Sequence, residues 1–144
     1  QFTDGLCKAL DDDMAHPLRL EIETWFLIPE QITDHHKKAV WELMSRGICV
    51  YANVPMISGI NDDPVIMVAL ADRLRRTGVE FHHLYVGGLP IQDRFNPGSG
   101  IAAQRLTAIA SAVRRSCSGR QIPLYVIQTP NGEIPADVTR PFVS

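Results

Sequence analysis

Residues 49–86 read CVYANVPMISGINDDPVIMVALADRLRRTGVEFHHLYV and contain one complete strand–helix–strand unit. Residues 49–57 and 79–86 are apolar runs rich in β-branched and aromatic side chains, which is typical of strands. Between them, Pro64 suits the first turn of a helix and Gly78 suits its end. The apolar stripe of that helix comprises Ile66, Met67, Leu70 and Leu74. This stretch therefore predicts two parallel strands joined by a helical crossover.

The same alternation continues on both sides of this unit. We expect a strand at residues 18–24 and a helix at 33–47 before it. A Gly- and Pro-rich loop at 87–100, a helix at 101–119 and a strand at 123–128 follow it. The expected inward-facing helix residues are Ala39, Val40, Leu43, Met44, Ile101, Leu106, Ile109 and Val113. Strands recur about every 30 residues, so the predicted fold class is α/β, with parallel strand–helix repeats.

The two ends of the chain break this alternation. The first pattern is a helix capped by Thr3, with an apolar stripe and then an acidic turn at residues 11–13. That stripe comprises Leu6, Ala9, Leu10 and Met14. Because an alternating α/β protein ordinarily begins with a strand, we expect residues 1–144 to be a single fragment of a larger fold. Its Pro-rich tail, residues 129–144, is expected to wrap a surface.

A fragment of this kind would expose the edge of its first strand. Unpaired backbone groups on a strand edge attract another chain. We therefore expect self-association through residues 18–24, or by exchange of residues 1–16 between copies.

Composition excludes several classes of protein. The chain has 144 residues, of which 45% are hydrophobic and 21% charged, and its formal net charge is −2. This balance gives no basic surface for nucleic acid. No apolar run approaches the roughly 20 residues that span a bilayer, and no secretion signal is present. We expect a cytoplasmic protein without nucleic-acid or membrane partners.

The potential metal ligands are poorly spaced for a shared ion. Cys7, Cys49 and Cys117 are widely separated, which suits buried, inert thiols better than a zinc site or disulfides. His82 and His83 lie in a predicted strand, where consecutive side chains point to opposite faces. His35 and His36 are about 100° apart on a helix. The sequence therefore predicts no metal site.

Two carboxylates and two glycines offer weaker signals. Glu21 and Glu23 share one strand face, where they are either an acid–base pair or surface charge; inside a closed barrel they would need a partner such as Arg19. Gly87 and Gly88 follow a strand, but no helix begins at once, so no dinucleotide fingerprint is present.

Several segments, taken in order, resemble motifs of the lysine 2,3-aminomutase family of radical S-adenosylmethionine enzymes. The similarity runs from Phe2 to about Pro135, and the SGIND block is its most specific piece. The resembling segments are 2–7 (FTDGLC), 24–26 (TWF), 29–33 (PEQIT), 47–62 (GICVYANVPMISGIND) and 119–130 (GRQIPLYVIQTP).

This resemblance implies a partial (βα) barrel of the TIM type, of which the chain supplies the later strands, so that residues 1–144 would be a single C-terminal half-barrel fragment. The family's reaction moves an amino group between neighbouring carbons of an amino acid. It uses a 4Fe-4S cluster to cleave S-adenosylmethionine, and pyridoxal phosphate to hold the amino group as an imine. The cluster cysteines would lie before Gln1, so we expect this chain to hold none of these cofactors and to be inactive alone.

The resemblance also aligns functional positions. A family His that positions S-adenosylmethionine aligns with Trp25, and a Gln of the next strand with Asn53, which makes these the candidate cofactor-binding residues. Two substrate-binding aspartates align with Gly88 and Gln128. The family's cofactor lysine has no counterpart, and Glu133 stands there instead. A Schiff base needs an amine, so pyridoxal phosphate is not expected in the family's manner, nor lysine as substrate.

Barrel sites assemble at the C-terminal ends of the strands. The candidate substrate pocket there comprises Thr24, Tyr85, Gly88 and Gln128, and no residue is assigned a catalytic role. Trp25 either stacks on adenine or plugs the barrel mouth. The expected ligand is an amino-acid-like small molecule. Two other functions stay open, namely a non-catalytic structural or oligomerising module and an independent small-molecule-binding domain.

Overall fold

The computed structural model describes residues 4–6, 8–9, 19–96 and 100–138. Residues 4–6 and 8–9 are helical. The strands are β1 (Glu21–Thr24), β2 (Cys49–Pro55), β3 (Glu80–Gly87), β4 (Leu124–Thr129) and β5 (Gly132–Pro135). The helices are α2 (Asp34–Met44), α3 (Pro64–Thr77), α4 (Pro90–Phe95) and α5 (Ala103–Ser116), with 3-10 turns η1 (Pro29–Gln31) and η2 (Gly119–Gln121).

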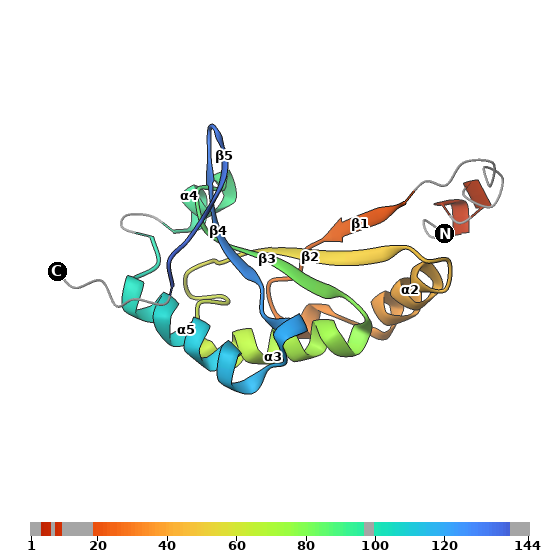
Figure 1. Ribbon diagram of the computed structural model, residues 1–144, viewed down its shortest axis with the longest axis horizontal. Helices are drawn as coiled ribbons and strands as arrows, with labels where there is room; N and C mark the ends of the chain where they lie inside the picture. Colours follow the sequence, from red (N-terminus) through yellow and green to blue (C-terminus); the bar gives the residue numbers. More distant parts are fainter. Residues whose placement is uncertain (1–3, 7, 10–18, 97–99, 139–144) are drawn as a thin grey trace.

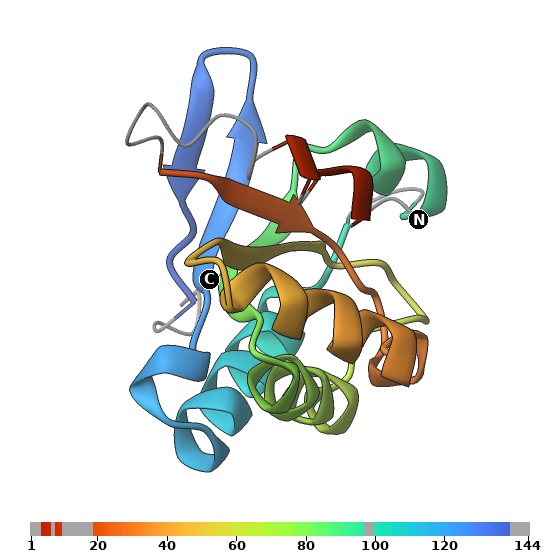
Figure 2. The ribbon, with the colours of Figure 1, turned by 90° about the vertical axis from the view of Figure 1, so that its right-hand side faces the viewer.

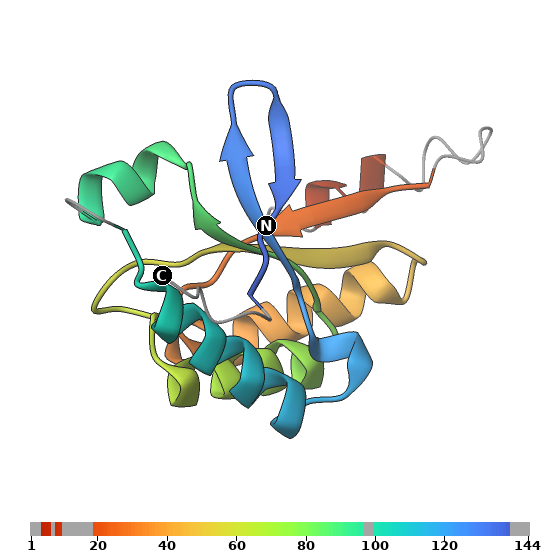
Figure 3. The same cartoon turned by 60° about the vertical axis from the view of Figure 1, so that its left-hand side comes forward.

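The strands form one sheet in the order β1-β2-β3-β4-β5. Neighbouring strands from β1 to β4 are parallel, and β5 returns antiparallel to β4. Helices α2, α3 and α5 lie together on one face of the sheet (Figures 1 and 3). This architecture confirms the predicted α/β fold with parallel strand–helix repeats, and it resembles part of a (βα) barrel.

The boundaries of α3 show why the sequence folds in this way. The Asp63 carboxylate accepts hydrogen bonds from the backbone N–H groups of Val65 and Ile66, which have no partner within the helix. Pro64 occupies the first turn, where its missing N–H costs nothing. Gly78 ends the helix at φ +92°, in the left-handed region that favours glycine.

The core lies between the sheet and the three long helices. Alternate residues of β2, namely Val50, Ala52 and Val54, are buried on the face that the helices cover. The largest fully buried helix side chains that pack there are Met67, Leu70, Leu74, Ile109 and Val113. Burial of such side chains contributes about 1.5–3 kcal/mol each to folding. Because the core occupies the face that the helices cover, only the opposite face of the sheet is left for a functional site.

Part of the described tail, residues 129–138, differs from its prediction. Residues 132–135 do not wrap a surface but form β5, which pairs with β4 (Figure 2). The Thr129 hydroxyl donates to the Gly132 carbonyl at 2.7 Å and accepts from the Asn131 N–H. Gly132 has φ +115°. Asn131 and Gly132 are a residue pair common in the turns that join hairpin strands, but the strand after this turn is too short and polar to be visible in the sequence.

The predicted loop at 87–100 also contains structure, because α4 lies within it. Two expected inward-facing residues are exposed, namely Ala9 and Met44. Met44 lies in the last turn of α2, against Gly78. Others are half-buried: Ala39, Ile66, Ile101 and Leu106.

Some predictions fall outside the described residues, namely the Thr3 cap, Cys7, Leu10, the turn at 11–13, Met14 and Leu18. In the part of the chain that the structure describes, no helix is long and apolar enough to cross a bilayer.

Candidate functional site

The face of the sheet away from α2, α3 and α5 carries most of the polar side chains of the strands. Glu21 and Glu23 of β1 are exposed there, which confirms that they share a face. Glu23 is in register with Tyr51 of β2, and Asn53 is in register with His83 of β3. We call this surface the open face, made by Glu21, Glu23, Tyr51, Asn53, His82, His83, Tyr85, Gln128 and Glu133.

A bulge in β3 places two histidines on this face. The register between β2 and β3 shifts at Ala52/Asn53, so that His82 is an extra residue in β3. The rings of His82 and His83 are stacked, with centroids 3.9 Å apart and planes inclined by 19°. The prediction that they point to opposite faces is therefore wrong. The prediction assumed that side chains alternate regularly along the strand, and the sequence gives no sign of the bulge.

The open face holds a continuous series of polar and aromatic contacts. At the β1 edge, the Arg19 guanidinium lies 2.9 Å from a Glu21 carboxylate oxygen, which also accepts from the Tyr51 hydroxyl at 3.4 Å. Tyr51 packs against His82, with ring centroids 5.3 Å apart. Arg19 is thus the partner that the sequence suggested for the β1 carboxylates.

The series ends at Glu133 of β5. The Tyr85 hydroxyl donates to Oε1 of Glu133, and Nδ1 of His83 lies 3.5 Å from its Oε2. The rings of His83 and Tyr85 meet edge to face at 5.9 Å. Strands β3 and β5, which flank β4, thus bring a phenol, an imidazole and a carboxylate together. Sequence reasoning missed this cluster, because β5 was not predicted and the histidines were considered only as metal ligands.

The surroundings change the acidity of two members of the cluster. Burial lowers the pKa of His83, and His82 lowers it further, against the opposing effect of the Glu133 and Glu23 carboxylates. Burial, together with the hydrogen bond to Glu133, raises the pKa of Tyr85 to about 12. At neutral pH the cluster therefore presents a neutral imidazole and a protonated phenol beside a carboxylate.

This shift predicts a pH dependence of stability. The folded protein resists protonation of His83, whereas the unfolded chain binds that proton with a pKa of about 6.5. The free energy of unfolding should therefore fall as the pH is lowered below about 6.5. A His83→Gln variant should lose less stability over the same range. Urea unfolding at several pH values measures both slopes, and equal slopes would contradict this assignment.

The C-terminal strand ends are held by buried amide side chains. Asn61 follows β2; it accepts from the Ile57 N–H at 2.6 Å and donates to the Pro55 carbonyl at 3.0 Å. Gln92 of α4 donates to the backbone carbonyls of Met56 and Tyr85. These bonds fix the loop after β2 against the end of β3. The SGIND block therefore has a clear structural role at the mouth of the candidate site.

The loop after β2 is also tied to α5. The Asp62 carboxylate accepts from the Gly59 N–H at 2.7 Å and lies 2.9 Å from the Arg105 guanidinium. Arg105 is partly exposed, whereas Asp62 is buried. This pair anchors the loop between the sheet and the helical layer.

Gly88 and Gln128 are brought together at the ends of β3 and β4. Gly88 has φ +89°, and a Cβ atom built on it would lie 1.9 Å from the Gln128 backbone oxygen. The Gln128 side chain donates to the Thr129 carbonyl at 3.0 Å. Two predicted pocket residues are thus neighbours, but position 88 has room only for glycine.

The other predicted residues are more scattered. Tyr85 belongs to the open-face cluster, whereas Thr24 is in register with buried Ala52, on the face that the helices cover. Trp25 follows β1 and is 53% exposed. Asn53 lies on the open face, and its Oδ1 atom is buried without a hydrogen-bond partner. Such an orphan acceptor in a native fold usually marks a missing donor.

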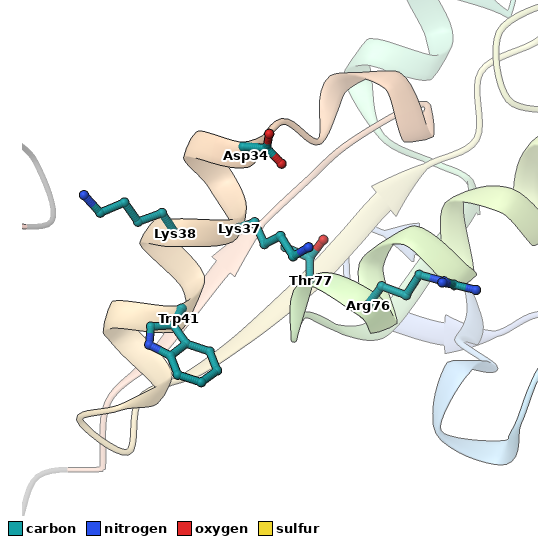
Figure 4. Close-up of a pocket in the computed structure, with 6 residues that line it drawn as sticks. All are labelled: Asp34, Lys37, Lys38, Trp41, Arg76 and Thr77. Atoms are coloured by element: carbon teal, nitrogen blue, oxygen red, sulfur yellow. The ribbon is translucent and has the colours of Figure 1, made fainter.

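A hollow on the other side of the molecule is a less suitable site. It has a volume of about 430 Å³ and lies between α2 and α3, on the helical layer (Figure 4). Its lining residues are Asp34, Lys37, Lys38, Trp41, Arg76 and Thr77. Figure 4 shows Lys38 extending away from the hollow, and Arg76 is engaged by Asp72 at 2.7 Å. The strand ends do not reach it.

No family model matches this chain. A putative L-lysine 2,3-aminomutase of Aquifex aeolicus is 32% identical to it over 117 residues, which cover 78% of this chain and 30% of that protein. The L-lysine 2,3-aminomutase of Methanococcus maripaludis is 28% identical, over 92% of this chain and 29% of that protein. The glutamate 2,3-aminomutase of Clostridioides difficile is 26% identical, over 92% of this chain and 30% of that protein.

The chain belongs to the lysine 2,3-aminomutase-like family, as a divergent member. It spans about 30% of the length of the curated relatives it matches. A barrel-like α/β fold with a polar open face suits membership of this family, since barrel enzymes gather their polar site residues at and near the C-terminal strand ends. The roles suggested for Trp25, Asn53, Gly88 and Gln128 stay predictions.

Proposed function

We propose that the chain is the later part of the catalytic barrel of a radical S-adenosylmethionine aminomutase, with its open face turned toward the reaction. The complete protein would move an amino group between neighbouring carbons of an amino-acid-like substrate. This chain, residues 1–144, would form one half-barrel unit and would not act alone. The observation that carries the proposal is the one-sided sheet: helices cover one face, and polar residues of neighbouring strands gather on the other.

Two residues suit the binding of S-adenosylmethionine. The orphan Oδ1 of Asn53 is a buried acceptor that an N–H or O–H of this cofactor would satisfy. Trp25 is an exposed aromatic ring at the end of β1, where it would stack on adenine. When bound, S-adenosylmethionine supplies the radical that starts this class of reaction. Asn53 and Trp25 would orient it, and no proton transfer is assigned to either.

The described residues do not fit the other two cofactors. No three Cys, His, Asp or Glu side chains among them are grouped to hold a metal ion, so the cluster has no ligand set here. The lysines of the sequence are Lys8, Lys37 and Lys38. Lys37 and Lys38 belong to α2 in the helical layer, and Lys8 lies in the N-terminal helical segment. None of the residues that make up the open face is therefore a lysine that could form an imine with pyridoxal phosphate.

The test is S-adenosylmethionine cleavage by the complete protein that contains this chain. After anaerobic reconstitution with iron and sulfide, and reduction with dithionite, it should form 5′-deoxyadenosine. Incubation with L-lysine or L-glutamate, followed by NMR of the products, shows whether an amino group moves. The chain of residues 1–144, treated in the same way, should form neither product.

A matched pair of variants tests the cofactor position. Asn53→Leu removes the orphan acceptor and should lower 5′-deoxyadenosine formation at least about tenfold, because a lost hydrogen bond leaves the cofactor's donor unpaired. Its thermal stability should not fall, since a buried unsatisfied group is removed. Asn131→Leu, in the exposed turn before β5, should leave cleavage unchanged. A reconstituted complete protein that cleaves no S-adenosylmethionine would refute the proposed function.

A further inference from the structure

We propose that Glu133, His83 and Tyr85 form a site that binds the free ammonium group of an amino-acid-like substrate on the open face. The inference rests on the proposed function for the class of substrate, but on the geometry of these three residues for the site. It assigns to Glu133 the task of holding the amino group without an imine.

The Glu133 carboxylate keeps hydrogen-bonding capacity after its contacts within the protein. Two carboxylate oxygens offer about four lone-pair directions. The Tyr85 hydroxyl uses one on Oε1, and Nδ1 of His83 faces Oε2 from 3.5 Å. About two directions remain for N–H groups of a ligand. An ammonium group, with its N–H donors and positive charge, matches that remainder.

His83 adds a second acceptor to the site. The nearby carboxylate favours the tautomer that carries its proton on Nδ1. Nε2 then has a free lone pair and accepts a hydrogen bond. The His82 ring stacks on that of His83, with centroids 3.9 Å apart, so protonation of both rings would place two positive charges side by side. This repulsion lowers the pKa of His83 further. The imidazole therefore stays neutral near pH 7, as an acceptor for a cation must.

The charge around the cluster favours a cation. Arg19 pairs with Glu21, and Arg120 lies 3.9 Å from Glu80. Among the described residues, neither lysine nor arginine pairs with Glu133, whose only ion-pair contact is His83. Glu23, on the same face, also acts on the charge states of His83 and Tyr85. The field there is negative and lacks a balancing cation.

The cluster is accessible as well as structured. The Glu133 side chain is 36% exposed and that of His83 is 15% exposed, whereas Tyr85 is buried beneath them. A purely structural role, in which Glu133 fastens the β4–β5 hairpin to β3, would not need a carboxylate, since the oxygen of an amide can also accept from Tyr85. The structural role therefore does not require a negative charge on Glu133, whereas ammonium binding does.

The test measures the binding of L-alanine and L-lysine to the complete protein by calorimetry, with L-lactate as the probe that replaces the ammonium of alanine with a hydroxyl. Both amino acids should bind through the α-ammonium group, whether or not either is a substrate, and lactate should bind at least about tenfold more weakly, since its neutral hydroxyl brings no positive charge to Glu133. With ¹³C-labelled histidine, the His83 ring signals should shift on addition of L-alanine and stay in place with L-lactate.

Three variants separate binding from folding. Glu133→Gln keeps an acceptor for Tyr85 but removes the charge, and should weaken L-alanine binding about tenfold or more. Asp72→Asn, on α3 in the helical layer, removes a carboxylate that Arg76 already neutralises at 2.7 Å, and should change binding less than about twofold. If Glu133→Gln fails to fold, His83→Gln provides the same comparison through loss of the Nε2 acceptor.

The outcomes distinguish this inference from the proposed function. Charge-dependent binding at Glu133 without S-adenosylmethionine cleavage would support the ammonium site and refute the proposed function. Cleavage with unchanged L-alanine binding in folded Glu133→Gln would overturn the ammonium site alone. Equal binding of L-alanine and L-lactate by the unmodified protein would overturn it as well.

Discussion

Replacement of Gly88 by alanine should lower the free energy of unfolding by about 2–5 kcal/mol. Two independent costs add at this position. At φ +89°, any residue with a Cβ atom is strained by about 1–2 kcal/mol. The new methyl group would also lie 1.9 Å from the Gln128 backbone oxygen, so β3 and β4 must separate to admit it. Urea unfolding followed by circular dichroism measures the loss.

Two other glycines separate these costs. Gly59 has φ +73° but no atom within 4 Å of a built Cβ, so Gly59→Ala should show the backbone cost alone, about 1–2 kcal/mol. Gly87 has neither a positive φ nor a close neighbour, and Gly87→Ala should change stability by less than about 1 kcal/mol. If the variants at 88 and 59 lost equal stability, the close approach to Gln128 would not exist as described.

The close approach at Gly88 also bears on the site. The sequence resemblance aligns a substrate-binding aspartate of the family with this position, an alignment that stays a prediction, and the Gln128 backbone leaves no room here for a side chain. The departure from the motif is therefore built into the packing of β3 against β4. Under the proposed function, the candidates for this role are instead the exposed carboxylates of Glu23 and Glu133 on the open face.

The fold was largely predictable because its signals are local. The Asp63–Pro64 start and the Gly78 end of α3 are set by backbone chemistry that individual residues reveal. Strands β2 and β3 are apolar runs bounded by such signals, and a short crossover makes them parallel. β5 escaped prediction because its stability comes from pairing with β4. The sequence of residues 132–135 carries no apolar period of its own.

The site was less predictable because it depends on register. One extra residue in β3 brings His82 and His83 onto the same face, and no spacing rule reveals where a bulge will occur. The contact of Glu133 with Tyr85 joins residues 48 positions apart through a hairpin. Asn53 was found through its resemblance to a motif, but only the structure shows that its Oδ1 lacks a partner.

Replacement of Asn61 by alanine should cost about 2–5 kcal/mol, the second large effect that we expect. Asn61 is fully buried, and its amide closes the loop after β2 with two hydrogen bonds. Alanine would leave the Ile57 N–H and the Pro55 carbonyl without these partners, and each unsatisfied buried group costs about 1–3 kcal/mol. Thermal and urea unfolding of the variant should show the loss directly.

Two further substitutions show whether the amide itself is responsible. Asn61→Asp keeps the acceptor for Ile57 but turns a donor into a negative oxygen beside the Pro55 carbonyl, so it should destabilise at least as much as alanine. Asn131→Ala, in the exposed turn before β5, should change stability by less than about 0.5 kcal/mol.

Asn61 and Asp62 hold the loop at the C-terminal end of β2. Under the proposed function, Asn61→Ala should therefore also weaken binding of S-adenosylmethionine in the complete protein. Wild-type stability of Asn61→Ala would mean that the loop after β2 is held by contacts other than those of the Asn61 amide.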